Sequence, residues 1–420
     1  MTKRPDGFGA YITVTAAYWA FMLTDGALRM LVLLHFHSLG FHPIQLAYLF
    51  LLYEFMGIVT NLSAGWIAAR FGLSKTLYGG LFLQISALMG LSQLDPTWAV
   101  GTSVIFVMAA QGLSGVAKDL TKMSSKSAVK LLSPNGGNNQ LFKWVTALTG
   151  SKNAFKGFGF FVGAALLAAF DFNVVTLGMA VGLLIILLGA LIFMPPGLPV
   201  GNKKAKFSQV FSNDSNINRL SAARFFLFGA RDVWFVVGIP IYFHAVLTGD
   251  FNLTPRESFF IVGGGMALWI VGYGAIQAAA PSLLRAKDKP LEILVRLTCK
   301  WAGILTVIPM LLVGASIFGN NGEIWLSITL VLGLMLFGAV FALNSALHSF
   351  LILAFSNSNR VTMNVGFYYM SNAAGRLLGT LLSGLSFQFG GLTLCLVTAL
   401  TMCGLSWLMA TRMTNRFKLQ

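Results

Sequence analysis

The sequence predicts an all-α membrane protein with twelve transmembrane helices in two six-helix halves. Of its 420 residues, 56% are hydrophobic and only 10% are charged, and the mean hydropathy is +0.76. Soluble domains carry about 25% charged residues. Roughly twelve apolar stretches reach the length of about 20 residues that a helix needs to cross a bilayer. Lys and Arg gather in alternate loops, which is typical of multi-pass proteins.

Six helices are expected in the first half, residues 1–195, and each ends at a polar or turn-forming segment. The breaks include a basic loop at 69–75, Asp95-Pro96, the turn SPNGGNN at 133–139 and Pro195-Pro196. No Ala-x-Ala-like cleavage site follows the first apolar run, which we therefore interpret as a retained helix. The helices are expected over 11–37, 43–69, a stretch ending near 95, 98–118, 140–170 and a stretch ending at 195.

A linker at 196–214, rich in Pro, Gly and Lys, precedes the second half at 215–420. Six more helices are expected there: 218–247, stretches ending before 285, near 318 and near 355, one starting after 360 and one ending at 412. Most loop cations fall on the side of the termini, which we therefore expect in the cytoplasm. The opposite loops hold acidic residues instead, namely Asp95, Asp171, Asp250 and Glu323.

Lysines recur every fourth residue after the expected end of the fourth helix, at Lys118, Lys122, Lys126 and Lys130. This spacing predicts one basic helical face lying at the cytoplasmic membrane surface, where a partner protein could dock. The net charge of +16 could suggest nucleic acid. Its placement at helix ends indicates a topology signal instead, and no nucleic-acid partner is expected.

Ten charged residues are expected at bilayer depth, where each costs about 2.5–3.5 kcal/mol on insertion scales. They are therefore expected to line a water-filled cavity. With every acid paired, four cations would remain, and this surplus predicts an anionic ligand. The cations are Arg29, Lys152, Lys156, Arg224, Arg231, Lys300 and Arg376, and the acids are Asp25, Glu54 and Asp232.

The sequence leaves the partners of these charges open. Asp25 and Arg29 lie one helical turn apart, which fits an ion pair or a proton-sensitive pair. Glu54 fits a partner for Lys152 or Lys156, or a proton carrier.

Asp232 is expected to pair with Arg224 or Arg231, or to cap a helix. Lys300 lies nearer the cytoplasmic side and is expected to snorkel.

Polar stripes at helical spacing fit either cavity lining or hydrogen bonds between helices. The stripes are Asn364–Asn372–Arg376, Trp269–Tyr273–Gln277 and Asn344–His348, and the predicted substrate contacts are Arg29, Lys152, Lys156, Arg224, Arg231, Asn372, Arg376, Tyr273 and Asn344.

Catalytic and cofactor motifs are missing from the sequence. It has no nucleotide-binding loop and no Ser/His or Cys/His nucleophile pair, so neither an enzyme nor a cofactor is predicted. Three cysteines, Cys299, Cys395 and Cys403, indicate no disulfide framework. Three histidines near the end of the first helix fit solvated loop residues better than a metal site: His35, His37 and His42. These features favour a secondary transporter driven by an ion or substrate gradient.

The two halves share one short pattern. Ser151, Lys156 and Gly159 have the same spacing as Ser371, Arg376 and Gly379, and both sets fall on the fifth helix of their half. This repeated pattern agrees with two parallel six-helix halves around a central site, which is the major facilitator arrangement. It predicts that Lys156 and Arg376 face one cavity from equivalent positions.

The loop GWIAARFGLSK at 65–75 resembles the signature between helices two and three of major facilitator transporters. Gly65, Arg70, Gly72 and Lys75 match this signature, but Ala69 stands where an acid is usual. AQGLSG at 110–115 is similar to part of the helix-four motif without its arginine. The difference at Ala69 weakens the gating salt bridge that is usually assigned to this loop.

Three longer blocks resemble ArsJ-type organoarsenical efflux permeases. They are AYWAFMLTDGALRMLVLLHFHSLG at 17–40, SGVAKDLTKMSSKSAVKLL at 114–132 with LFKWVTALTGSKNAFKG at 141–157, and LSAARFFLFGARDVWFVVGIP at 220–240. The resemblance implies a bacterial inner (plasma) membrane protein that exports 1-arseno-3-phosphoglycerate and confers arsenate resistance. It also implies functional pairing with an arsenate-using glyceraldehyde-3-phosphate dehydrogenase, which makes this ester.

Other functions fit parts of the sequence. An organophosphate exchanger would use the same cations. A drug/proton antiporter favours acids and aromatics over a cationic cavity, and a sensor or scaffold would need an appended signalling domain. The charge pattern therefore favours an anion transporter that works by alternating access, with Asp25 and Glu54 as candidate proton carriers. The direction of transport, which is export, is implied only by the resemblance.

Overall fold

The computed structural model describes residues 8–131, 138–194, 212, 214–284, 289–320, 322–355 and 361–417. Nine of the described helical segments are long and apolar enough to cross a membrane. The elements are α1 (Phe8–Ser38), α2 (Pro43–Phe71), α3 (Leu73–Leu91), α4 (Val100–Leu131), α5 (Asn138–Ala169), α6 (Phe172–Phe193), α7 (Ser215–Val233), the π-helix η2 (Trp234–Gly238), α8 (Ile239–Gly249), α9 (Pro255–Leu283), α10 (Leu291–Phe318), α11 (Ile324–Phe355) and α12 (Val361–Phe417).

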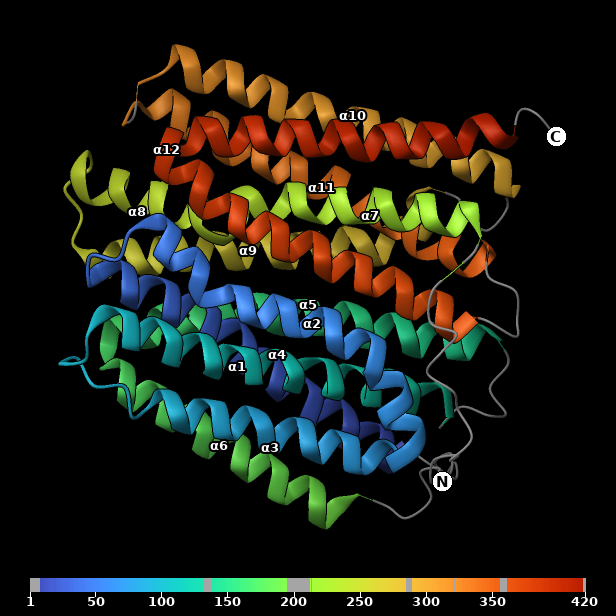
Figure 1. Cartoon of the computed structure of the whole chain (residues 1–420), viewed down its shortest axis with the longest axis horizontal. Helices are drawn as coiled ribbons and strands as arrows, with labels where there is room; N and C mark the ends of the chain where they lie inside the picture. Colours follow the sequence, from blue (N-terminus) through green and yellow to red (C-terminus); the bar gives the residue numbers. More distant parts are fainter. Residues whose placement is uncertain are drawn as a thin grey trace, which may run out of the picture.

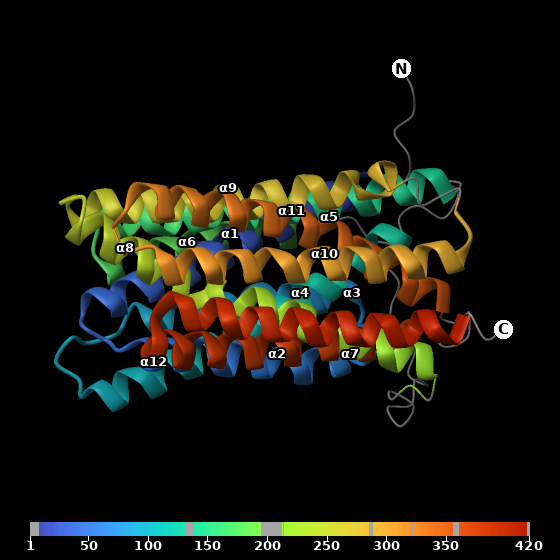
Figure 2. The ribbon, with the colours of Figure 1, turned by 90° about the horizontal axis from the view of Figure 1, so that it is seen from above.

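The helices form one bundle with roughly parallel axes (Figures 1 and 2). In Figure 1, α1–α6 occupy the lower part of the bundle and α7–α12 the upper part. The two groups meet where α2 packs against α12 and α5 against α9. The predicted linker at 196–214 lies outside the described residues except for Ser212 and Asp214.

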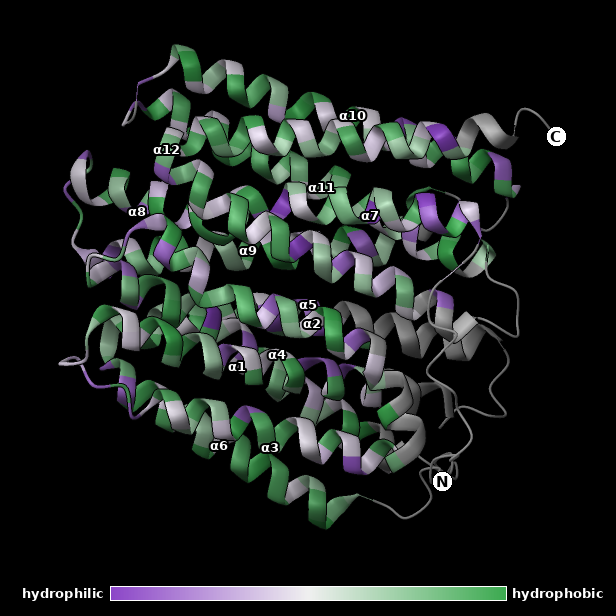
Figure 3. Ribbon diagram, viewed as in Figure 1, coloured by the Kyte–Doolittle hydropathy of each residue, from purple (hydrophilic) through white to green (hydrophobic). Residues whose placement is uncertain are grey.

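The outside of the bundle is apolar along most of its length. On α6, for example, Ile185, Ile192 and Phe193 are more than half exposed. Figure 3 shows the same pattern, with hydrophilic residues at the two ends of the bundle and at a few positions in its middle. Such exposed apolar side chains fit contact with the hydrocarbon core of a bilayer, because a surface in water would carry more polar side chains.

The two ends of the bundle differ in charge. The loops that hold Asp95, Asp171, Asp250 and Glu323 follow α3, α5, α8 and α10, whose ends lie on the left in Figure 1. We call this the acidic end. The opposite, basic end includes the exposed Lys75, just after the turn between α2 and α3, and Arg219 near the start of α7, which bonds the backbone of Arg412 near the end of α12. The loop acids therefore gather on one side, as the sequence analysis expected.

The predicted end of the fourth helix near Lys118 is wrong, because α4 continues to Leu131. The polar stretch stays helical because its small hydroxyl residues fit against α3. The hydroxyl of Ser124 donates to the carbonyl of Leu73 at 2.5 Å, and Thr121 packs on Gly80. A separate helix lying on the membrane surface is therefore not formed by residues 118–125.

α12 contains two helical arms. Gly390 and Gly391 have non-helical dihedral angles, and Gly391 adopts a φ of 59° that favours glycine. Figure 1 shows the two arms running in opposite directions. The arms coincide with the expected eleventh and twelfth helices. Twelve membrane crossings and a two-fold relation between the halves stay predictions.

The helix expected over 218–247 is continuous from α7 to α8 but contains the π-helix η2. Single π-turns are frequent at functional sites. Here the hydroxyl of Ser383 on α12 accepts hydrogen bonds from the backbone N–H groups of Val237 at 3.1 Å and Gly238 at 3.3 Å. The π-turn is thus held from a neighbouring helix.

Replacing Ser383 with alanine is expected to lower the free energy of unfolding by about 1–3 kcal/mol, because two buried N–H groups lose this acceptor. Thermal unfolding in detergent measures the loss. Ser383→Thr keeps a hydroxyl and serves as the control. An unchanged unfolding temperature in Ser383→Ala would show that hydrogen bonds within the helix are enough to hold the π-turn.

Candidate substrate cavity

A cavity lies in the middle of the bundle, between the two groups of helices. Side chains from α1, α2, α4, α5, α7, η2, α9, α11 and α12 line it. Its polar lining residues are Tyr18, Arg29, Glu54, Asn61, Lys118, Asp119, Lys122, Lys152, Asn153, Lys156, Arg224, Arg231, Tyr273, Gln277, Ser349, Tyr369, Asn372 and Arg376. Helices distant in sequence thus bring their charged residues to one place.

Most of the predicted substrate contacts lie at this cavity. Those that line it are Arg29, Lys152, Lys156, Arg224, Arg231, Tyr273, Asn372 and Arg376. Asn344 is not among the lining residues but is fully buried on α11, where neither atom of its amide group has a hydrogen-bond partner among the described residues. Lys300 is exposed on α10, away from the cavity. Whether the lining residues bind a substrate stays a prediction.

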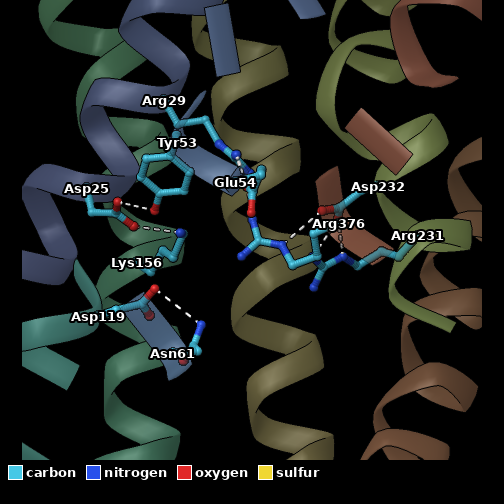
Figure 4. Close-up of polar contacts among 10 residues, drawn as sticks. All are labelled: Asp25, Arg29, Tyr53, Glu54, Asn61, Asp119, Lys156, Arg231, Asp232 and Arg376. Atoms are coloured by element: carbon cyan, nitrogen blue, oxygen red, sulfur yellow. Dashed lines mark hydrogen bonds and ion pairs between the residues drawn. The ribbon is translucent and has the colours of Figure 1, made fainter. Parts of the chain in front are cut away.

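Asp25 and Arg29 do not pair with each other. Asp25 accepts hydrogen bonds from the Tyr53 hydroxyl at 2.5 Å and from Nζ of Lys156 at 2.6 Å (Figure 4). Arg29 turns toward α2, where it bonds Glu54 at 2.6 Å and lies over the ring of Tyr53. Spacing along α1 brings the two residues to one face, but neighbouring helices offer each a better partner.

Glu54 joins the two halves of the bundle. It pairs with neither Lys152 nor Lys156, contrary to one expectation. Its Oε1 accepts instead from Arg29 at 2.6 Å and from Arg376 on α12 at 2.5 Å. Because Glu54 belongs to α2 and Arg376 to α12, this ion pair crosses between the halves (Figure 4).

The network continues through Asp232. Nε of Arg376 donates to Oδ2 of Asp232 at 3.0 Å, and Nε of Arg231 donates to Oδ1 at 2.6 Å. Asp232 therefore pairs with Arg231, one of the two arginines proposed from the sequence, and also with Arg376. We call Arg29–Glu54–Arg376–Asp232–Arg231 the ion chain.

The two parts of the repeated sequence pattern have similar surroundings. Lys156 on α5 bonds Asp25 on α1, and Arg376 on α12 bonds Asp232 on α7. The accompanying glycines, Gly159 and Gly379, pack closely on α1 and α7 respectively. Both cations line the same cavity.

Sequence reasoning missed a polar cluster on α4. Asp119 is completely buried and accepts from Lys122 at 2.5 Å and from the Thr60 hydroxyl at 3.0 Å. Asn61 bonds both Asp119 and Lys122. Lys118, Asp119 and Lys122 line the cavity and are not surface residues, because α4 does not end at Lys118. The sequence did contain one signal, because Asp119 lies between Lys118 and Lys122. An acid has no role in a basic helical face that binds the membrane surface.

The cavity carries an excess of positive charge. In the described part of the chain, eight cations line it, and four acids either line it or bond a lining cation. The excess of four cations equals the excess predicted from the sequence, although the set of charged residues at the cavity differs from the predicted set. The cations are Arg29, Lys118, Lys122, Lys152, Lys156, Arg224, Arg231 and Arg376, and the acids are Asp25, Glu54, Asp119 and Asp232.

Two of the histidines expected at the mouth, His35 and His37, are partly buried and pack on different rings. His37 on α1 packs edge-to-face on His244 on α8, with ring centroids 5.3 Å apart, and His35 stacks on Phe172. Among the described residues, no group of three or more His, Cys, Asp or Glu side chains could hold a metal ion. The His37–His244 contact links the two halves near the acidic end.

No protein-family model and no curated protein matches the sequence. The fold resembles the crystal structure of a mutant of the nucleoside transporter NupG, with a TM-score of 0.69 at 15% sequence identity, covering 97% of this chain and 100% of that one. It also resembles a bacterial homologue of the iron transporter ferroportin in an outward-facing state. That match has a TM-score of 0.62 at 14% identity and covers 97% of this chain and 99% of the other.

These likenesses show the fold, which this chain shares with the two transporter structures. The apolar spans are those of a multi-pass membrane protein. Nucleosides and iron belong to the names of the two neighbours, and at these identities neither cargo transfers to this chain.

Proposed function

We propose that this protein is a secondary transporter that exports an anionic organoarsenical, 1-arseno-3-phosphoglycerate, and so confers resistance to arsenate. The observation that carries the anionic substrate is the excess of four cations at the central cavity. Charges of one sign in a low-dielectric cavity attract and hold ligands of the other sign. Guanidinium groups also match the oxygens of phosphate and arsenate esters.

The proposed transport cycle is alternating access between residues 1–195 and 215–420, with twelve crossings and both termini in the cytoplasm. The cavity between the two groups of helices supports this cycle, because a site between moving halves can open to either side. The negative-inside potential would help expel an anion by about 2.3 kcal/mol per charge per 100 mV. Asp25 and Glu54 are the proposed proton-coupling residues if a proton takes part.

The arsenical part of the proposal rests on the resemblance of the three long sequence blocks. The cysteines support a pentavalent ester over trivalent arsenic, which favours thiolate ligands. Cys395 and Cys403 are buried in α12, and neither lines the cavity. The dehydrogenase is proposed as a functional partner only. Two of the four lysines of the expected docking face line the cavity, so docking on that face is not part of the proposal.

Arsenate tolerance of a sensitive bacterial host tests this function. We expect growth when the transporter and the dehydrogenase are expressed together, and no protection from either alone. Lys156→Ala should remove the protection because Asp25 loses its cation, whereas Lys300→Ala, which changes an exposed lysine, should not. Immunoblots of membrane fractions confirm equal expression.

Failure of every combination to protect cells would contradict the arsenical substrate. An organophosphate exchanger with the same fold is then the better interpretation. Exchange of labelled phosphate for 3-phosphoglycerate in proteoliposomes would demonstrate that activity.

A further inference from the structure

The ion pairs around the cavity leave one buried arginine without an acidic partner. Among the described residues, Arg29, Arg231 and Arg376 each bond a carboxylate, as do Lys122 and Lys156. Arg224 on α7 lines the same cavity and is only 5% exposed, but all of its bonded partners are neutral. A buried charge without a counter-ion is costly, so an anion that binds there would relieve that cost.

Neutral groups hold the Arg224 guanidinium in a fixed position. Nε donates to the side-chain oxygen of Asn372 at 2.9 Å, and Nη1 donates to the hydroxyl of Ser345 at 2.8 Å and to its carbonyl at 3.2 Å. The guanidinium also lies over the ring of Phe228, 3.9 Å from its centroid. These bonds use Nε and Nη1 and leave the two N–H groups of Nη2 for a ligand.

A line of neutral hydrogen bonds connects Arg224 to the other half. The Ser345 hydroxyl, on α11, also accepts from the amide of Gln277 on α9 at 3.2 Å. The Gln277 oxygen in turn accepts from the amide of Asn153 on α5 at 3.3 Å. Substrate bound to Arg224 would therefore adjoin a contact between α9 and α5, across the interface between the halves.

Lys118 is a second cation without a carboxylate within salt-bridge distance in the described part of the chain. Its Nζ lies 4.0 Å from the centroid of the Tyr53 ring, and it lines the cavity from α4. The acids nearby already have cations: Asp25 bonds Lys156, and Asp119 bonds Lys122. Lys118 and Arg224 thus offer positive charge from opposite halves.

We propose that Arg224 and Lys118 are the primary contacts for an oxyanion group of the substrate, a phosphate, arsenate or carboxylate. The arginines of the ion chain instead hold the two halves together and do not bind the oxyanion first. The inference rests on the proposed function in one respect, which is that the cargo is an anion. It reverses the expectation that Arg231 is a principal ligand, because Asp232 already neutralises that residue.

Direct binding to the purified full-length protein tests the inference. The probes are 3-phosphoglycerate and inorganic arsenate, titrated by calorimetry in detergent. Arg224→Gln is expected to weaken binding by about tenfold or more, because a charge-assisted hydrogen bond is lost. Lys118→Gln should weaken it several-fold, and Lys300→Gln should leave it unchanged.

Arg224→Lys keeps the charge but cannot bond Asn372 and Ser345 in the same way, so it should bind with intermediate affinity. It also serves if Arg224→Gln does not fold, as judged by gel filtration. Wild-type affinity in folded Arg224→Gln and Lys118→Gln would overturn the inference while leaving an anion transporter in place. A wild-type protein that binds neither probe would overturn both the inference and the anionic cargo.

Discussion

Replacing Glu54 with glutamine is expected to abolish transport and to lower the free energy of unfolding by about 3–5 kcal/mol, the usual cost of removing one partner of a buried ion pair. Glu54 is completely buried, and one of its oxygens accepts from both Arg29 and Arg376. Glutamine has nearly the same shape but no charge. The two guanidinium groups would then face each other without the carboxylate between them.

Thermal unfolding in detergent and arsenate tolerance measure the two effects. Glu292→Gln, at an exposed position in the first turn of α10, is the matched control and should change neither. The double variant Glu54→Gln/Arg376→Gln should be less destabilised than the sum of the single variants, because residues that share an ion pair are coupled. Additive effects, or a Glu54→Gln protein as stable as wild type, would contradict the ion chain as a link between the halves.

Substitution of Gly159 by leucine is expected to prevent accumulation of the folded protein. A Cβ atom at this position would overlap the carbonyl oxygen of Leu23 and lie 3.0 Å from the backbone nitrogen of Ala27, both on α1. Backbone atoms cannot move aside as a side chain can, so α1 and α5 would have to separate. Overpacking costs about 1–3 kcal/mol for added methylenes, and a complete leucine side chain exceeds that range.

Fluorescence-detected gel filtration of tagged variants measures the folded yield. Gly79→Leu on α3 is the matched control, because a Cβ there meets nothing within 4 Å. Gly159→Ala should give an intermediate yield. Equal monodisperse yields for Gly159→Leu and Gly79→Leu would show that the α1–α5 contact is not tight.

Sequence patterns located most helices and most of the charged cavity. The length of the apolar stretches predicted membrane spans, because every backbone polar group in a bilayer must bond within its own helix. Nine of the described segments have the required length and hydropathy. The rarity of charge at bilayer depth singled out Arg29, Lys156, Arg231 and Arg376, which do line one cavity. The repeated Ser–cation–Gly pattern placed Lys156 and Arg376 together there.

The extent of α4 could not be read from hydropathy. A drop in hydropathy at Lys118 looks the same whether a helix leaves the membrane or turns a polar face toward an internal cavity. Only packing against α2 and α3 distinguishes them, through contacts such as Asn61 with Asp119. Hydropathy and spacing therefore place Lys118 and Lys122 at the surface instead of at the cavity, and they do not single out Asp119.

The sequence by itself determined the all-helical membrane fold, the sign of the cavity and most of its cations, because these depend on composition and on spacing along single helices. Only the tertiary structure decided which charges pair. Asp25 and Arg29 are neighbours on one helix, but each bonds a residue from another helix, Lys156 and Glu54 respectively. The partner of a charge depends on how adjacent helices are rotated and how far apart they lie, and neither quantity is recorded in the spacing of residues along one helix.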